Sequence, residues 1–137
     1  MKYAAAYLAA LLFFFLADMV WLGTMVSRLY RPTLGDLLLP GVKMPPSILF
    51  YLLYPAGLVI FAIVPALKCG NVTTALILGA AFGFFTYGTY DLTNQATLRN
   101  WSTTLTIADM AWGSVLGGIS AASAAWVVTR LFQQTAA

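Results

Sequence analysis

Residues 3–26 read YAAAYLAALLFFFLADMVWLGTMV, and a single charged residue, Asp18, interrupts this apolar run. A helix that crosses a lipid bilayer needs about 20 consecutive, mostly apolar residues. The run is also longer than the apolar region of a signal peptide, which has about 7–15 residues. We therefore expect residues 3–26 to form an uncleaved membrane-spanning helix.

Three further stretches, 47–67, 72–98 and 103–131, are long and apolar enough to span a bilayer. Overall, 61% of the residues are hydrophobic and 8% are charged, whereas soluble proteins carry about 25% charged residues. Residues 31–46 are rich in proline and glycine, which predicts a loop. The sequence thus predicts an all-α, multi-pass integral membrane protein, a four-helix bundle in which residues 1–137 form a single transmembrane domain.

The basic residues do not choose an orientation for this bundle. Four spans place both termini on one side, and the positive-inside rule then compares the lysines and arginines at the two ends. Either the chain inserts in both orientations or other signals decide, and we favour the second reading. The terminal side is expected to hold Lys2, Lys68 and Arg130, and the opposite side Arg28, Arg31, Lys43 and Arg99.

The third and fourth spans carry stripes of small residues. Gly79 with Gly83, and Gly113 with Gly117, each form a GxxxG pattern, which lets two helix backbones approach closely in lipid. Packing inside the bundle is the use we favour. The alternative is a homodimer or a larger membrane complex.

Three of the four acidic residues, Asp18, Asp91 and Asp109, fall inside apolar spans. A carboxylate in a span costs about 3 kcal/mol on insertion scales, so it usually faces the bundle interior and often marks function. At about 1.5 Å per residue, the three lie roughly 9–12 Å from the face that carries the long loop. We therefore expect them to share one depth in the membrane.

Aromatic and amide side chains accompany these carboxylates. Helical residues three or four apart lie on one face, which places a tryptophan, tyrosine or asparagine beside each acid. Tyr51 and Tyr54 of the second span fall in the same layer. The candidate ligand- or proton-binding residues are therefore Asp18, Asp91, Asp109, Asn94, Trp21, Trp112, Tyr54, Tyr87 and Tyr90.

Two short segments are nearly identical. Residues 17–21 read ADMVW and residues 108–112 read ADMAW, on spans expected to run antiparallel. Inverted internal repeats occur in membrane transporters, but a chance match in an alanine-rich chain explains the similarity equally well. Both readings stay open.

A structural role for the acids is the main alternative to a binding site. Asp18 would then hold Arg28 or Arg31, and Asp91 would hold Arg99, so that polar contacts simply pin the helices together. The chain has no histidine and one cysteine, so we expect no metal site. It also has no cofactor motif and no basic, aromatic-interleaved patch for nucleic acid.

One region resembles a known family. Residues 90–98 read YDLTNQATL and residues 109–113 read DMAWG, with Trp101 between them. Together with Asp18, Trp21 and the segment FYLLYP at 50–55, they resemble a family of small predicted bacterial membrane proteins, domain of unknown function 2177. The resemblance covers nearly the whole chain. It implies four helices in the bacterial inner (cytoplasmic) membrane, and no established activity.

Three functions compete at this point. A binder or carrier of a small lipophilic or cationic ligand would use the carboxylates to exchange a proton for a cation and the aromatic rings for cation–π contacts. An enzyme acting on a membrane lipid or isoprenoid would use them as general acid and base. A structural or assembly subunit would use them only for packing. We favour the first, with membrane lipids as surroundings, and whether the chain is an enzyme stays open.

Overall fold

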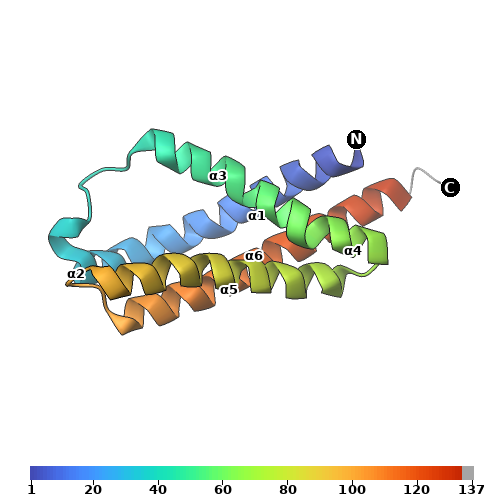
Figure 1. Cartoon of the computed structure of the whole chain (residues 1–137). Coiled ribbons are helices and arrows are strands. Elements are labelled where there is room, and N and C mark those ends of the chain that lie inside the picture. Colours follow the sequence, from blue (N-terminus) through green and yellow to red (C-terminus); the bar gives the residue numbers. More distant parts are fainter. Residues whose placement is uncertain (134–137) are drawn as a thin grey trace.

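The computed structural model describes residues 1–133, and every regular element among these residues is a helix (Figure 1). Four helical segments are long and apolar enough to cross a membrane: Lys2–Leu37, Met44–Cys69, Val72–Thr97 and Thr103–Phe132. The predicted all-α fold with four spans is therefore confirmed.

The first span is longer than predicted. Helix α1 (Lys2–Met25) continues through a π-helical turn (Val26–Tyr30) into α2 (Arg31–Leu34) and a 3₁₀ turn (Gly35–Leu37). The predicted loop over 31–46 is too long at both ends, because helical backbone persists to Leu37 and resumes at Met44. The φ angle of Gly35 is +51°, a backbone conformation that glycine adopts far more readily than other residues, and α2 ends there.

The second span is also interrupted by a wide turn. It comprises α3 (Met44–Leu58), a π-helical turn (Val59–Ile63) and α4 (Val64–Cys69). Each π-helical turn ends two residues before a proline, Pro32 in the first span and Pro65 here. Proline lacks an N–H, and its ring crowds the carbonyl four residues earlier. A single wide turn relieves that conflict without ending the helix.

Helices α5 (Val72–Thr97) and α6 (Thr103–Gln133) are the third and fourth spans. The turn from α4 into α5 is short because Gly70 adopts the left-handed conformation, with φ of +66°. Asn71 then caps α5, since its side-chain oxygen accepts a hydrogen bond of 2.9 Å from the Thr73 backbone N–H.

The stripes of small residues bring α5 and α6 into backbone contact. A Cβ atom added to Gly83 would lie 1.9 Å from the carbonyl oxygen of Gly113, and one added to Gly117 would lie 2.3 Å from that of Gly79. Both GxxxG patterns are thus used within the chain, as we favoured, and are not free to bind a second copy.

The second span joins the other three unevenly. Helix α1 packs along α6, whereas the second span contacts α5 chiefly through its π-helical turn and α4. The first half of α3 leans away from α5 and α6 (Figure 1). The chain's N-terminus and the C-terminal end of α6 lie at the same end of the bundle (Figure 1). The tilt of α3 leaves room for a cavity toward the opposite end.

Candidate functional site

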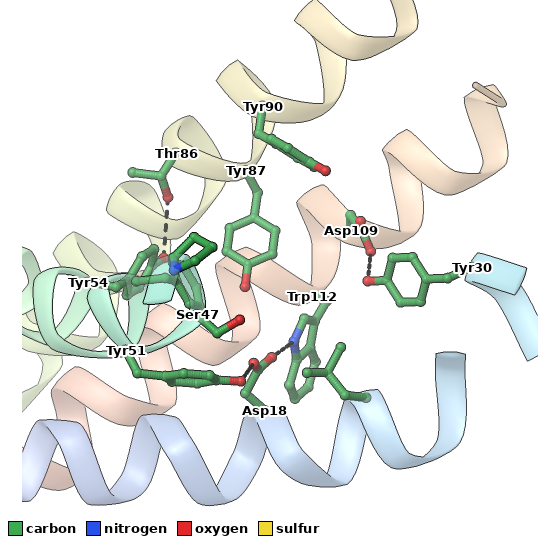
Figure 2. Close-up of a pocket in the computed structure, with 13 residues that line it drawn as sticks. Asp18, Tyr30, Ser47, Tyr51, Tyr54, Thr86, Tyr87, Tyr90, Asp109 and Trp112 are labelled. Carbon is green, nitrogen blue, oxygen red and sulfur yellow. Dashed lines mark hydrogen bonds between the residues drawn. The ribbon is translucent and has the colours of Figure 1, made fainter. Parts of the chain in front are cut away.

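A cavity of about 600 Å³ lies between the first half of α3 and the three other spans (Figure 2). Its wall is made of aromatic rings, two carboxylates and a few small polar groups. The lining residues are Asp18, Leu22, Tyr30, Pro46, Ser47, Phe50, Tyr51, Tyr54, Thr86, Tyr87, Tyr90, Asp109 and Trp112.

Asp18 is buried on α1 and is held by two neutral donors. The Tyr51 hydroxyl of α3 donates a hydrogen bond of 2.6 Å to Oδ2, and the Trp112 indole N–H of α6 donates one of 3.3 Å to Oδ1 (Figure 2). One carboxylate therefore connects three of the four spans. The side chain is 5% exposed, and a ligand would reach it from the cavity that it lines.

Asp109 is buried on α6 and is held by a tyrosine from the first span. The Tyr30 hydroxyl donates a hydrogen bond to Oδ1 of Asp109 (Figure 2). The same hydroxyl accepts a hydrogen bond of 3.0 Å from the Trp21 indole N–H. Tyr30 reaches this position because the first helix continues through its π-helical turn.

Two stacked indoles connect the two acids. The rings of Trp21 and Trp112 lie 4.5 Å apart at an interplanar angle of 4°. Trp112 donates a hydrogen bond to Asp18 directly. Trp21 donates one to Tyr30, which in turn donates one to Asp109. The near-repeated segments 17–21 and 108–112 thus meet face to face, each tryptophan turned toward the acid of the other helix.

The predicted site residues divide into two groups. Six of them line the cavity: Asp18, Asp109, Tyr54, Tyr87, Tyr90 and Trp112. Three do not: Trp21 lies behind Trp112 in the stack, and neither Asn94 nor the fully buried Asp91 belongs to the lining.

The arginine pairs that the sequence allowed are absent. Among residues 1–133, Asp18 and Asp109 bond to tyrosine and tryptophan donors rather than to Arg28 or Arg31. Neither oxygen of Asp91 has a hydrogen-bond partner in that range, Arg99 included. The acids are therefore not neutralised by basic side chains of the described chain.

Several lining residues do not belong to the predicted set. The sequence placed Tyr51 in the layer of the acids, one helical turn before Tyr54, but not among the candidate residues. Tyr30 carried no such signal, because a π-helical turn changes which residues share a face. The others outside the predicted set are Leu22, Pro46, Ser47, Phe50 and Thr86. Pro46, Ser47 and Phe50 belong to the first half of α3, whose outward tilt no sequence pattern indicates.

The donor set decides what this site can do chemically. Within residues 1–133, no three His, Cys, Asp or Glu side chains come together. The cavity instead offers two oriented carboxylates surrounded by phenol, indole and phenyl rings. Such a surface attracts positive charge through the acids and apolar groups through the rings.

One comparison with known proteins identifies the family of this chain. A family model described as "Predicted membrane protein (DUF2177)" matches residues 3–126, which confirms the resemblance inferred from the sequence. No match was found among curated proteins or among solved structures.

Proposed function

We propose that this chain, which belongs to the DUF2177 family of predicted membrane proteins, binds a small lipophilic cation in the cavity between α3 and the other spans. The observation that carries the proposal is the pair of buried carboxylates, Asp18 and Asp109, on one apolar and aromatic cavity wall.

Charge balance supports a cationic ligand. The thirteen lining residues include two carboxylic acids and no lysine or arginine. A buried carboxylate is stable only when it is paired or well hydrogen-bonded. Asp18 has two donors and Asp109 has one, so both retain capacity to accept a further donor or a positive charge.

The rest of the wall supports an apolar body on that cation. Tyr54 is buried and stacks on Phe14 with ring centroids 4.5 Å apart, while Tyr87 approaches Tyr54 edge-on at 6.2 Å. Rings fixed in this way are suited to cation–π contacts, which are worth about 2 kcal/mol when desolvated.

The rim of the cavity supports entry from the bilayer. Phe50 on α3 is 37% exposed and Tyr90 on α5 is 58% exposed, and both belong to the lining. In a membrane these exposed edges face lipid. A ligand dissolved in the bilayer would reach the acids by passing between α3 and α5. We place the protein in the bacterial inner (cytoplasmic) membrane as part of this proposal.

The test is equilibrium binding of radiolabelled tetraphenylphosphonium to the purified chain in detergent. We expect saturable binding that Asp18→Asn and Asp109→Asn each weaken about tenfold or more, because a charge-assisted contact is worth about 1.5–3 kcal/mol and 1.4 kcal/mol is tenfold. Neutral triphenylphosphine oxide should compete poorly.

Asp36→Asn is the matched control, because Asp36 lies in the 3₁₀ turn outside the cavity. It should bind the probe like the native chain. Equal affinity of the native, Asp18→Asn and Asp109→Asn proteins would contradict the proposal.

A further inference from the structure

Asp91 is a buried acid outside the cavity lining. It lies on the face of α5 that meets α6, one turn after Gly88 and one turn before Gln95. A Cβ atom on Gly88 would lie 3.0 Å from Met110 Cε, and Gln95 bonds to Thr106 at 2.7 Å. Asp91 therefore faces the stretch of α6 that carries Asp109.

Asp91 has no hydrogen-bond partner at either carboxyl oxygen among residues 1–133, and its side chain is 0% exposed. Its polar neighbours are satisfied without it. Thr106 donates to the Gln95 side-chain oxygen and accepts a hydrogen bond of 3.1 Å from the Trp101 indole, and the Gln95 amide donates to Thr103 at 2.9 Å. The polar side chains of Gln95, Thr106 and Trp101 thus bond to one another and leave no hydrogen bond to Asp91.

A purely structural role does not account for this arrangement. An unpaired charge in a dry interior costs many kcal/mol, and in a membrane span no water from the bilayer core relieves that cost. Asp18 and Asp109 each receive donors from other helices, so this fold can supply partners to acids that hold it together. Asp91 receives none.

The position of Asp91 links it to the cavity. It faces the stretch of α6 that carries Asp109, and the neighbouring residue Tyr90 lines the cavity. Two carboxylates on facing helices repel each other when both are charged, and Tyr90 is the other titratable side chain at this corner of α5. A cation bound at Asp91 neutralises its carboxylate and therefore reduces the negative potential that Asp109 offers to a ligand.

We propose that Asp91 binds one small monovalent cation, H⁺ or Na⁺, and that this cation and the cavity ligand displace each other. The exchange is balanced in charge, because one positive charge arrives at Asp109 as one leaves Asp91. Coupling between two binding sites is reciprocal and typically amounts to a 5–150-fold change in affinity. The coupling rests on the proposed function, whereas the cation site itself does not.

The cation site is tested on the purified chain without any ligand. If the cation is H⁺, the infrared spectrum at neutral pH contains the carbonyl band of a protonated carboxyl group, which Asp91→Asn removes and Asp36→Asn keeps. If it is Na⁺, replacing choline chloride by NaCl raises the unfolding temperature of the native chain and leaves Asp91→Asn unchanged. Absence of both effects in the native chain overturns the proposal.

If Asp91→Asn does not accumulate in the membrane, the infrared assignment can be made with a variant that keeps Asp91. The native spectrum is then compared with that of a chain in which Asp18, Asp36 and Asp109 are all changed to asparagine, so that Asp91 is the one acidic side chain left. A band retained in that chain is assigned to Asp91, and its loss counts against Asp91.

The coupling is tested with tetraphenylphosphonium as probe. The native chain should lose about fivefold or more in affinity when the cation identified above is raised to saturation, and Asp91→Asn should lose that dependence. An equal dependence in both proteins overturns the coupling. A positive cation assay with no probe binding would leave the Asp91 site standing while the proposed function fails.

Discussion

At the scale of single residues, the stacked indoles of Trp21 and Trp112 connect the two acids of the site. Their stacking is worth about 0.5–1.5 kcal/mol beyond area burial, and each N–H is also committed to the hydrogen-bond network of one acid. A change in either ring therefore disturbs both Asp18 and Asp109. Two acids on different helices behave as one unit for this reason.

Replacing Trp112 with phenylalanine removes one donor from Asp18 and one indole from the stack. Two indoles stacked 4.5 Å apart couple their electronic transitions, and a rotation of one ring relative to the other within the stack turns this coupling into an exciton couplet, which we expect in the circular dichroism spectrum of the native chain. We expect Trp112→Phe to abolish the couplet and to lower the free energy of unfolding by about 1–3 kcal/mol, the usual cost of a lost buried hydrogen bond.

Trp126→Phe is the control for this spectrum. Trp126 is 53% exposed and lies on the lipid-facing side of α6, where Arg130 approaches its ring. It should retain the couplet. A couplet that survives in Trp112→Phe and in Trp21→Phe would show that these indoles do not stack.

The same residues show how far sequence reasoning reaches at this scale. Asp18 and Asp109 could be predicted because an acid within an apolar span is costly, whatever surrounds it. Tyr30 could not, because its contact with Asp109 spans 79 positions in the chain and depends on a π-helical turn. Spacing rules assume a regular helix, and they fail at the turn that creates the site.

At the scale of helices, the number of spans could be predicted from the sequence, but the shape of the first two spans could not. Hydropathy located every span, because the number of apolar residues needed to cross a bilayer is a property of length alone. The prolines of residues 31–46 were interpreted as a loop, but Pro32 follows a wide turn and the helix continues to Leu37. The tilt of α3, which makes room for the cavity, depends on packing between segments that are far apart in the sequence. A local sequence pattern therefore does not predict it.

The contact between α5 and α6 gives the sharpest prediction at this scale. Gly83→Ala places a methyl group where the carbonyl oxygen of Gly113 lies, 1.9 Å from the added carbon. The helices must separate, so we expect the free energy of unfolding to fall by about 1–3 kcal/mol, as for other overpacked cores. Thermal unfolding of the purified chain in detergent measures this loss.

Gly23→Ala is the matched control, since a Cβ atom at Gly23 has no heavy atom within 4 Å. Alanine is a better helix former than glycine by about 1 kcal/mol, so this variant should be as stable as the native chain or more so. Equal stability of Gly83→Ala and the native chain would show that α5 and α6 are not in backbone contact.

At the scale of the whole molecule, basic residues occupy both ends of the bundle. Lys68 lies at the end of α4, near the N-terminus, whereas the opposite end carries Arg31 and the connection to α3 (Figure 1). The sequence places three basic residues at one end and four at the other. The positive-inside rule needs a clear excess, so the orientation has to be measured.

The single native cysteine makes that measurement direct. Cys69 is exposed at the end of α4, and Gly41 is exposed in the connection before α3, at the opposite end of the bundle. In right-side-out and inverted vesicles, a membrane-impermeant maleimide should label Cys69 from one side only. Gly41→Cys, made together with Cys69→Ser, should be labelled only from the other side.

This result would mean that signals other than net basic charge fix one orientation, which is the reading we favour. Labelling of both positions from both sides, in equal amounts, would instead show dual insertion. The cavity would then open near opposite faces of the membrane in the two populations, since it lies toward the end of the bundle that carries Gly41. A ligand entering from one leaflet would then reach the cavity near that leaflet in only half of the molecules. The labelling pattern therefore decides what fraction of sites a binding experiment on whole membranes should count as accessible.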